Sequence, residues 1–462
     1  MSAIITSLFR LENANNFIGD ITNVSNSVYV FIGKTDPWSS GLSTPTDSSV
    51  SLYPPADDLQ DRNSAWQNMI ALQLIGASNV ENVCPRYTWT SGTAYVAWND
   101  ADTAIFTKAF YVVTDEYKVF KCIVAGSGAS TVKPTATSSS APFTLGDGYT
   151  WKYMYTIFTT DAANFLTSDF MPVKTATLAQ YTANPSSDLG TKWLYQLDCQ
   201  TNRSGKVYRY VVTNGGTGYT STPTAVISGD GTGAVATVNY LGGTVTSVVV
   251  STGGSGFETN AGSGYNQCFV TITGGGGTGA TVVAVLSPTN GHGWDPVSEL
   301  GGFYVGISTQ LQYAAGGGDF PVGVAFRQLG LIKNPYEYGT TTVATETDRS
   351  ALKSFTYSGA GGFAVTDYIT GTTSGAIAFI DAINTGTSTI RYHQNFKTGF
   401  VPFTAGETIT GHTSGTGVIL SSGGFTSPDV QRFSGTILFL DNRDPIMRSS
   451  TQIENINMII QF

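Results

Sequence analysis

The chain has 462 residues and a formal net charge of −9; 12% of its residues are charged, 41% are hydrophobic and 54 are glycine. This length exceeds the ~250–300 residues that one hydrophobic core usually serves, so we expect several structural units. Low charge combined with abundant glycine, threonine and valine is typical of an all-β protein. The 41% of hydrophobic and 12% of aromatic residues exclude a disordered chain. Basic residues form no cluster, which argues against nucleic acid as a partner.

The sequence contains no apolar run of the ~20 residues that a membrane span needs, so no membrane partner is expected. The first residues lack a basic stretch followed by a hydrophobic core, and we therefore predict no signal peptide. Cys84, Cys122, Cys199 and Cys268 show no CxxC spacing. We expect four free thiols, as in a reducing cytosol.

The N-terminal third mixes strands with a little helix. A continuous apolar run predicts a strand over 27–33, followed by a turn at Pro37 and Trp38. A helix is predicted between Asp58 and Ile75, because apolar residues recur there at helical spacing. Gly76 stands where the C-cap of that helix belongs. A second, shorter helix is predicted after Thr160.

Short strands are predicted over 94–98, 110–113 and 117–124, and the clearest strand over 146–158, GDGYTWKYMYTIF. Within this last stretch aromatic residues alternate at a period of two, which places Tyr149, Trp151, Tyr153, Tyr155 and Ile157 on one face. An aromatic ladder of this kind either stacks on sugars or forms the core face of a sheet, and we favour the core.

Two segments contain internal repeats. From about 205 to 288 the chain is rich in Gly, Thr and Val; GGTGY at 215–219 recurs as GGSGF at 253–257, and SGDGTGA at 228–234 recurs as TGGGGTGA at 273–280. Further on, ITGTTSG at 369–375 recurs as ITGHTSG at 409–415. Repeats of this size indicate small duplicated β-units, which we interpret as insertions into an older core.

These shifts predict a mainly β protein with a layered β-sandwich core, one or two short helices in loops, and two inserted small all-β modules. The predicted division is 1–204 for the first part of the core, 205–286 for the first repeat module, 287–354 for the second part of the core, 355–430 for the second repeat module and 431–462 for the closing strands.

Residue patterns typical of catalysis or ligand binding are missing from the sequence. Gly33-Lys34-Thr35 follows a strand, but Val28 stands where a phosphate-binding loop needs its first glycine, and Pro37 would block the helix that follows such a loop. The glycine-rich repeats carry too few carboxylates for calcium. Histidines show no metal-ligand spacing, and a GxSxG nucleophile motif is absent. We therefore predict no catalytic residue, no bound metal and no cofactor.

The segment GHGWDPVSELGG around His292 is dense enough in polar and aromatic residues to be considered as a site. We favour a structured loop in which Trp294 packs and Asp295-Pro296 opens a turn.

Four blocks of sequence carry a resemblance to a known family. They are FIGKTDPWSS at 31–40, GDGYTWKYMYTI at 146–157, AFRQLGLIKNP at 325–335, and the closing pair GTILFLDNRDPI and IENINMIIQF at 435–446 and 453–462. In these blocks the chain resembles the dimeric baseplate wedge subunit of T-even-type contractile-tailed bacteriophages. The two glycine-rich repeat segments have no counterpart in the compact members of that family.

The resemblance implies a structural protein of the virion, located in the tail baseplate and synthesised in the host cytoplasm. It implies a β-sandwich that pairs with itself as a homodimer and binds other baseplate wedge proteins, without enzymatic activity. Protein interfaces are commonly anchored by Trp, Tyr and Arg. The candidate anchors are Trp38, Trp66, Trp294, Arg327 and Arg443, although each is also a candidate for the core.

An alternative function is recognition of host-surface glycans by a tail-associated protein. In that case exposed aromatic residues of the first repeat segment would stack on sugar rings, and the candidates are Tyr219, Phe257 and Tyr265. A glycan hydrolase is a third possibility, and it would need a pair of carboxylates ~5–9 Å apart on one sheet face.

Overall fold

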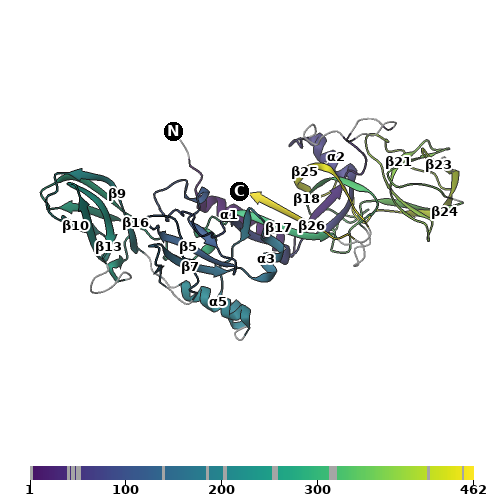
Figure 1. Ribbon diagram of the computed structural model, residues 1–462. Coiled ribbons are helices and arrows are strands. Elements are labelled where there is room, and N and C mark those ends of the chain that lie inside the picture. Colours follow the sequence, from purple (N-terminus) through teal and green to yellow (C-terminus); the bar gives the residue numbers. More distant parts are fainter. Residues whose placement is uncertain are drawn as a thin grey trace. The chain divides into compact units, whose positions relative to one another are not determined.

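The computed structural model confirms a mainly β protein (Figure 1). It describes residues 4–38, 42, 47, 54–137, 141–183, 187–200, 205–251, 259–311, 320–359, 361–413, 417–449 and 452–462. The sandwich arrangement of the core and the boundaries of the inserted modules stay predictions.

The α-helices of the described residues are α1 (Ser7–Thr22), α2 (Leu59–Asn68), α3 (Thr159–Phe165), α4 (Leu178–Ala183), α5 (Asp188–Cys199) and α7 (Pro296–Glu299). The strands of the first half of the chain are β1 (Val28–Gly33), β2 (Met69–Leu74), β3 (Val80–Pro85), β4 (Tyr111–Val113), β5 (Lys118–Val124), β6 (Phe143–Thr144), β7 (Thr150–Thr156), β8 (Phe170–Pro172), β9 (Val207–Thr217), β10 (Thr224–Gly229) and β11 (Thr232–Ala234).

The remaining strands are β12 (Ala236–Leu241), β13 (Thr244–Val250), β14 (Ala261–Ser263), β15 (Cys268–Thr273), β16 (Thr278–Leu286), β17 (Tyr304–Leu311), β18 (Ala325–Lys333), β19 (Lys353–Ser358), β20 (Tyr368–Gly371), β21 (Ile377–Asn384), β22 (Thr389–His393), β23 (Thr408–Gly411), β24 (Gly417–Thr426), β25 (Thr436–Met447) and β26 (Glu454–Gln461). The strands form several sheets with antiparallel pairs, and one sheet has the order β26-β17-β3-β8, in which β3 and β8 are antiparallel.

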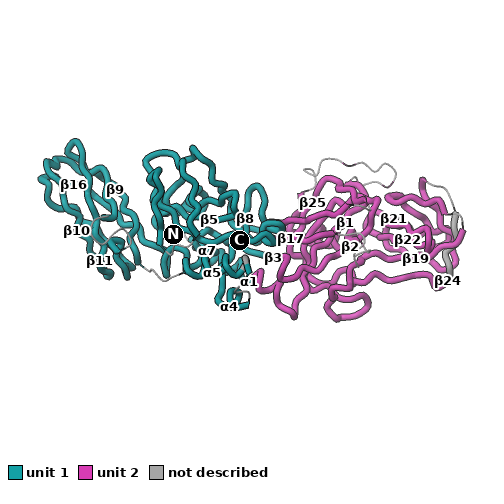
Figure 2. Tube along the Cα trace, turned by 60° about the horizontal axis from the view of Figure 1, so that its bottom comes forward, with its two compact units in different colours: residues 1–16, 81–306, 459–462 teal, residues 17–80, 307–458 magenta. Residues whose placement is uncertain are grey.

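The chain divides into two compact units, and each consists of separate stretches of sequence (Figure 2). Unit 1 comprises residues 1–16, 81–306 and 459–462, and unit 2 comprises residues 17–80 and 307–458. Each repeat segment lies in one unit together with other stretches of the chain.

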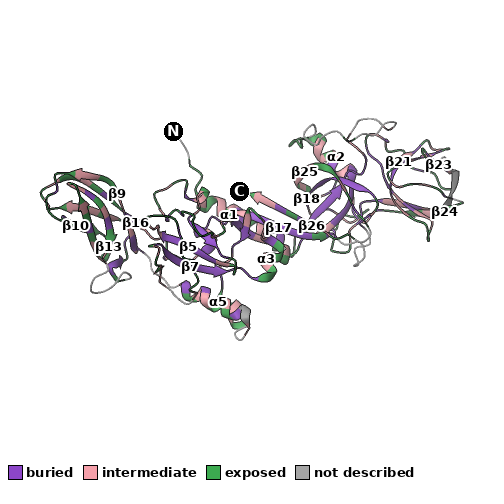
Figure 3. Ribbon diagram, viewed as in Figure 1, coloured by how far each residue is buried: buried purple, intermediate pink, exposed green. Residues whose placement is uncertain are grey.

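Unit 1 contains the aromatic strand that the sequence predicts. β7 lies in the sheet β4-β5-β7-β6, and all seven of its residues are buried (Figure 3). Tyr149, Trp151 and Tyr153 pack in one core cluster, whereas Tyr155 and Ile157 pack in another. Register shifts in the pairing of β5 with β7 break the period of two, so the five residues do not share one face.

The glycine-rich segment of unit 1 forms a second sheet, β10-β15-β16-β9, with two smaller ribbons. Its two halves exchange contacts. The ring of Tyr219 covers Gly277, where an added Cβ would lie 2.5 Å from the ring, and the ring of Tyr265 covers Gly231, where it would lie 2.4 Å away. Both tyrosines are buried in the core of this segment. Each tyrosine of one half therefore fills the space that a glycine of the other half leaves open.

Unit 2 contains the sheet β2-β1-β18-β25, in which every residue of β1 is buried. β1 pairs with β18 in a register that sets Phe31 opposite Gly330. A Cβ at Gly330 would lie 2.6 Å from the Phe31 ring, so the ring needs glycine there. The predicted strand over 27–33 is confirmed.

The second repeat segment, which belongs to unit 2, forms a closed barrel in the strand order β19-β22-β21-β20-β23-β24. The two ITG motifs pair with each other around Thr370 and Thr410. An acidic residue before each motif binds the turn after the other. Glu407 accepts hydrogen bonds from the backbone N–H groups of Thr373 and Ser374 at 3.1 and 2.9 Å, and Asp367 accepts one from the N–H of Thr413 at 2.9 Å.

Several predicted elements differ from the structure. The helix predicted between Asp58 and Ile75 ends at Asn68, because the apolar run 69–74 instead forms β2, which pairs with β1. The predicted strand over 94–98 is wrong, since these described residues belong to no strand. The helix predicted after Thr160 is confirmed as α3. α1 and α5 are helices that the sequence analysis did not predict.

All four cysteines are free, as predicted. Of the helices that the structure describes, none combines the length and the apolar character that crossing a bilayer demands.

We predict that Gly277→Ala destabilises the glycine-rich segment by about 1–3 kcal/mol, because the new methyl group would overlap the buried ring of Tyr219. The measurement is hydrogen–deuterium exchange of peptides from 207–286, whose protection falls with the free energy of local opening. Gly146→Ala is the matched control, because a Cβ there meets no atom within 4 Å. Equal protection in the two variants would contradict this packing.

Candidate functional site

The segment Lys34-Thr35-Asp36, directly after β1 and here called the KTD segment, belongs to a group of buried charges in unit 2. Lys34, Thr35 and Asp36 are each 3% exposed, although two of them carry charge. Gly33 allows this, since a Cβ there would lie 2.5 Å from the carbonyl oxygen of Asn68 at the end of α2. The N–H of Lys34 donates to that same carbonyl at 2.9 Å. The end of α2 therefore fixes where the KTD segment begins.

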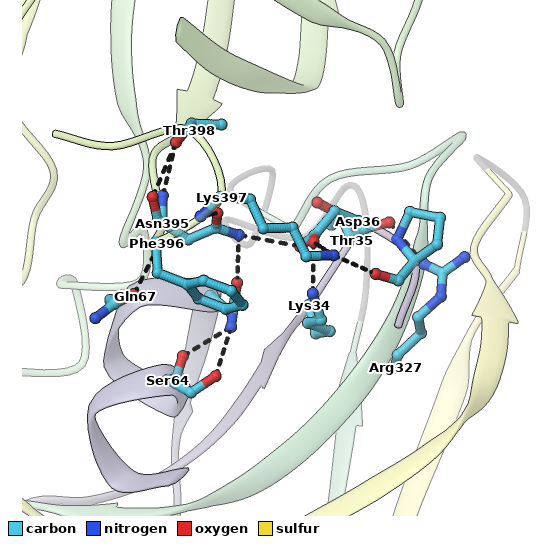
Figure 4. Close-up of polar contacts among 12 residues, drawn as sticks. Lys34, Thr35, Asp36, Ser64, Gln67, Arg327, Asn395, Phe396, Lys397 and Thr398 are labelled. Carbon is cyan, nitrogen blue, oxygen red and sulfur yellow. Dashed lines mark hydrogen bonds and ion pairs between the residues drawn. The ribbon is translucent and has the colours of Figure 1, made fainter. Parts of the chain in front are cut away.

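Asp36 is the centre of this group (Figure 4). Its Oδ2 lies 2.5 Å from Nζ of Lys34 and 2.7 Å from Nζ of Lys397. Its Oδ1 accepts a hydrogen bond from Nδ2 of Asn395 at 3.2 Å and lies 3.7 Å from Nε2 of His393. One buried carboxylate thus holds side chains from β22 and the loop after it beside the end of β1. We call Lys34, Asp36, Asp381, His393 and Lys397 the Asp36 cluster.

A second carboxylate, on a barrel strand, completes the cluster. Asp381 of β21 is fully buried and accepts a hydrogen bond from Oγ1 of Thr35 at 2.6 Å. It also pairs with Nδ1 of His393 at 2.8 Å. The imidazole of His393 therefore lies between two carboxylates, and the hydrogen bond from Thr35 to Asp381 joins residues that are 346 positions apart in the chain.

The charges of the cluster shift one another's pKa. Burial on its own would raise the pKa of Asp36, but Lys34, His393 and Lys397 outweigh it and hold that pKa below its ordinary range. Burial, opposed by the attraction of Asp36 and reinforced by repulsion from Lys397, lowers the pKa of Lys34 to about 8. Burial would lower the pKa of His393, yet Asp381 and Asp36 raise it above 6.5.

Arg327, predicted as an interface residue, supports this cluster from β18 instead. It is 6% exposed, and its Nη1 donates to the carbonyl oxygen of Thr35 at 2.6 Å. Its Nε and Nη2 both donate to Asp47 at 2.7 Å, and this paired hydrogen bonding lowers the pKa of Asp47. A guanidinium that is saturated inside the chain is a poor anchor for a partner, so this residue belongs to the interior.

The other predicted anchors are more accessible. Trp38 and Trp66 are partly buried, and their indole N–H groups donate to the carbonyl oxygens of Arg443 and Ser434 at 3.2 and 3.0 Å. The side chain of Arg443 is 49% exposed and pairs with Asp441. Trp294 is 39% exposed, so it packs only in part and keeps accessible surface.

The two glycan-binding candidates that the structure describes, Tyr219 and Tyr265, do not lie on the surface. Tyr219 and Tyr265 are 4% and 5% exposed, because their rings cover glycines of the opposite repeat. The expectation that they are exposed stacking platforms is wrong. Phe257 lies outside the described residues.

Unit 1 holds a second buried ion pair, in the segment that contains His292. Lys121 pairs with Glu299 at 2.7 Å, and its ammonium group lies 3.9 Å from the ring centroid of Trp98. Glu299 also accepts the N–H of Gly293 at 2.7 Å, which fixes the loop. Burial, together with the positive charges of Lys121 and Lys152, lowers the pKa of His292 well below 6.5. This histidine is therefore a neutral core residue.

In the Asp36 cluster and in the Lys121–Glu299 pair, the charged side chains bind one another. Among the described residues no three His, Cys, Asp or Glu side chains are placed to hold a metal ion. The carboxylates of the Asp36 cluster are occupied by lysine and histidine, so the arrangement stabilises the fold and offers no free base or nucleophile. Sequence reasoning missed Asp381, His393 and Lys397; the available signal was Asp381 inside the apolar run of β21.

Comparisons with known proteins point to a phage tail. A family model described as bacteriophage T4 Gp8 matches residues 3–126, which include β1, the KTD segment and α2. The chain is also similar to the baseplate wedge protein gp8 of Enterobacteria phage T4. The two are 24% identical over 245 residues, which cover 45% of this chain and 70% of that protein. These findings support a gp8-like wedge protein, and the family-model match ends before the glycine-rich repeat segments.

We predict that Asp36→Ala lowers the unfolding free energy of unit 2 by about 3–5 kcal/mol, because it leaves two buried ammonium groups without their shared carboxylate. Pulse proteolysis in increasing urea, with the fragments identified by mass, reports when the barrel becomes cleavable. Asp57→Ala, at an exposed position before α2, is the control and leaves this midpoint unchanged. An Asp36→Ala midpoint equal to that of wild type would rule out the cluster as a stabilising feature.

The cluster also predicts a pH dependence. The unfolded chain loses the proton of His393 near pH 6.5, while the folded chain keeps it to higher pH. Stability from this histidine is therefore fully present below pH 6.5 and is lost as the pH rises through the folded pKa. The urea concentration at the proteolysis midpoint should therefore decrease as the pH is raised from 6 to 8 in wild type. In His393→Gln it should not decrease. The range stops at pH 8 because Lys34 adds the opposite slope above it. Parallel profiles for the two proteins would contradict the assignment.

Proposed function

We propose that the chain is a structural component of a phage tail baseplate wedge, which pairs with itself and binds neighbouring wedge proteins during baseplate assembly. The observation that carries this proposal is the 24% identity to baseplate wedge protein gp8 over 70% of that protein's length. The family model adds support, because its match begins near the N-terminus and runs through the KTD segment.

The geometry of the buried charges favours a structural role over catalysis. A catalytic carboxylate or histidine needs access to substrate. In this chain Asp36, Asp381 and His393 are almost fully buried and are bound to one another. The free cysteines fit synthesis in a host cytoplasm before incorporation into the virion.

Contacts with neighbouring proteins would use the accessible anchors rather than Arg327. Trp38, Trp66, Trp294 and Arg443 retain exposed surface and stay candidates for such contacts. Binding of glycans through the first repeat segment receives no support, since its described aromatic candidates, Tyr219 and Tyr265, are buried.

We predict that the purified chain elutes as a dimer in size-exclusion chromatography with light scattering. Mixed with purified wedge proteins of the same phage, it shifts to a discrete heavier complex. A monomer that leaves all of these proteins unshifted would overturn the proposed function. The expected mass of each complex follows from the 48.8 kDa of one chain.

A further inference from the structure

Unit 1 contains a cavity between its glycine-rich segment and the sheet β4-β5-β7-β6. It encloses about 510 Å³, a volume typical of pockets that bind small molecules. Strands β9 and β13 contribute to its lining, and so do residues near the ends of β5, β6 and β7. The described lining consists mainly of valine, alanine and threonine, with two tyrosines and one arginine: Val124, Ala125, Thr144, Thr150, Tyr208, Arg209, Tyr210, Val211, Val212, Thr246, Ser247, Val248, Val249 and Val250.

The cavity runs along the edge of β9, which is the last strand of the sheet β10-β15-β16-β9. Five consecutive residues of this strand, 208–212, line it. Successive side chains of a strand point to opposite faces of its sheet. Side chains from both faces of β9 therefore reach the cavity at this edge.

Contacts within unit 1 hold the walls of the cavity together. Tyr208 of β9 packs in one core cluster with Ile123 of β5, and Val124 lies against that cluster. Nη2 of Arg209 donates to the carbonyl oxygen of Trp98 at 2.8 Å. A ligand would therefore enter a cavity that is already formed.

Two donor groups of the lining have no hydrogen-bond partner. The hydroxyl of Tyr210 is buried and unpaired, on a residue that is only 6% exposed. Burial raises the pKa of Tyr210, so this hydroxyl keeps its proton and is able to donate it. The Nε–H of Arg209 is buried and unpaired as well. Buried donors without an acceptor are costly, and two of them on adjacent residues of one cavity favour a ligand that accepts hydrogen bonds.

The charge of Arg209 indicates which kind of acceptor fits. Arg209 is the one charged residue in the described lining. Asp100 attracts it, but among the described residues it forms no ion pair, and its hydrogen bond goes to a neutral carbonyl oxygen. Hydrogen bonds between a guanidinium and a carboxylate are stronger than those to a neutral acceptor, especially where water is excluded. An anionic acceptor is therefore favoured.

We propose that this cavity binds a small carboxylate with an apolar body, of the kind that a medium-chain fatty acid provides. The carboxylate accepts hydrogen bonds from Nε of Arg209 and from the hydroxyl of Tyr210, and the apolar body lies against the valines of β9 and β13. Because the walls belong to the glycine-rich segment and to the neighbouring sheet, the ligand ties the two together. This inference does not depend on the proposed baseplate function.

The test titrates sodium decanoate into the full chain by calorimetry. Wild type should bind decanoate saturably, bind 1-decanol about tenfold or more weakly because decanol lacks the charge, and show no measurable binding of acetate, which lacks the apolar body. Tyr210→Phe and Arg209→Gln should each weaken decanoate binding by about tenfold, as expected for the loss of a hydrogen bond to a charged group.

Tyr240→Phe is the matched control for the loss of a tyrosine hydroxyl. Tyr240 belongs to the same glycine-rich segment, and its hydroxyl donates to the carbonyl oxygen of Thr220 at 3.2 Å instead of lining the cavity. This variant should bind decanoate as wild type does. The unligated Tyr210→Phe chain should be at least as stable as wild type, because it loses an unpaired buried hydroxyl, so its lower affinity does not come from misfolding.

Hydrogen exchange with and without decanoate locates the ligand. Increased protection of 207–212 and 246–250 supports the proposal, because a bound ligand stabilises the walls that it contacts. Protection elsewhere, a wild-type chain that does not bind decanoate saturably, decanol binding as tight as that of decanoate, or unchanged affinity in both variants would overturn it. Each of these outcomes leaves the proposed baseplate function standing.

Discussion

The arrangement of unit 2 depends on the buried ion pairs that the carboxylate of Asp36 forms with Lys34 and Lys397. Lysines from two distant parts of the sequence approach this carboxylate within 2.7 Å, and His393 links it to Asp381 of the barrel strand β21. Buried charges are costly unless they are paired and hydrogen-bonded, so each member of the cluster requires the others. The end of β1 and the barrel strands β21 and β22 are therefore fixed against each other by electrostatics rather than by apolar packing alone.

This constraint gives the KTD segment a physical meaning. As a sequence, Gly33-Lys34-Thr35 looks like the start of a phosphate-binding loop and is rejected because the flanking glycine is missing. In the structure the lysine binds a carboxylate two residues away, and the threonine donates to Asp381. The segment thus holds the barrel in place.

The sequence was sufficient for the elements with a local signal. The run over 27–33, the helix after Thr160 and the aromatic strand were all predictable, since hydrophobic periodicity records burial directly. The sequence analysis failed at 69–74, an apolar run that directly follows a helix. Such a short run fits the helical period and the strand period equally well, and only its pairing with β1 identifies it as a strand. The burial of Tyr219 and Tyr265 was equally out of reach, because it depends on glycines that lie 58 and 34 residues away in the chain. Arg327 and the Asp36 cluster depend on pairings over hundreds of residues, which a single sequence does not reveal.

The most direct test of this account is native-state hydrogen exchange of the wild-type chain in increasing urea. If the Asp36 cluster joins the sheet and the barrel into one cooperative unit, the most protected amides of β1 and of β22 converge on the same opening free energy. Amides of β22 that open at a clearly lower free energy than those of β1, at every urea concentration, would contradict it, because the barrel would then unfold without disturbing the strand that carries Asp36.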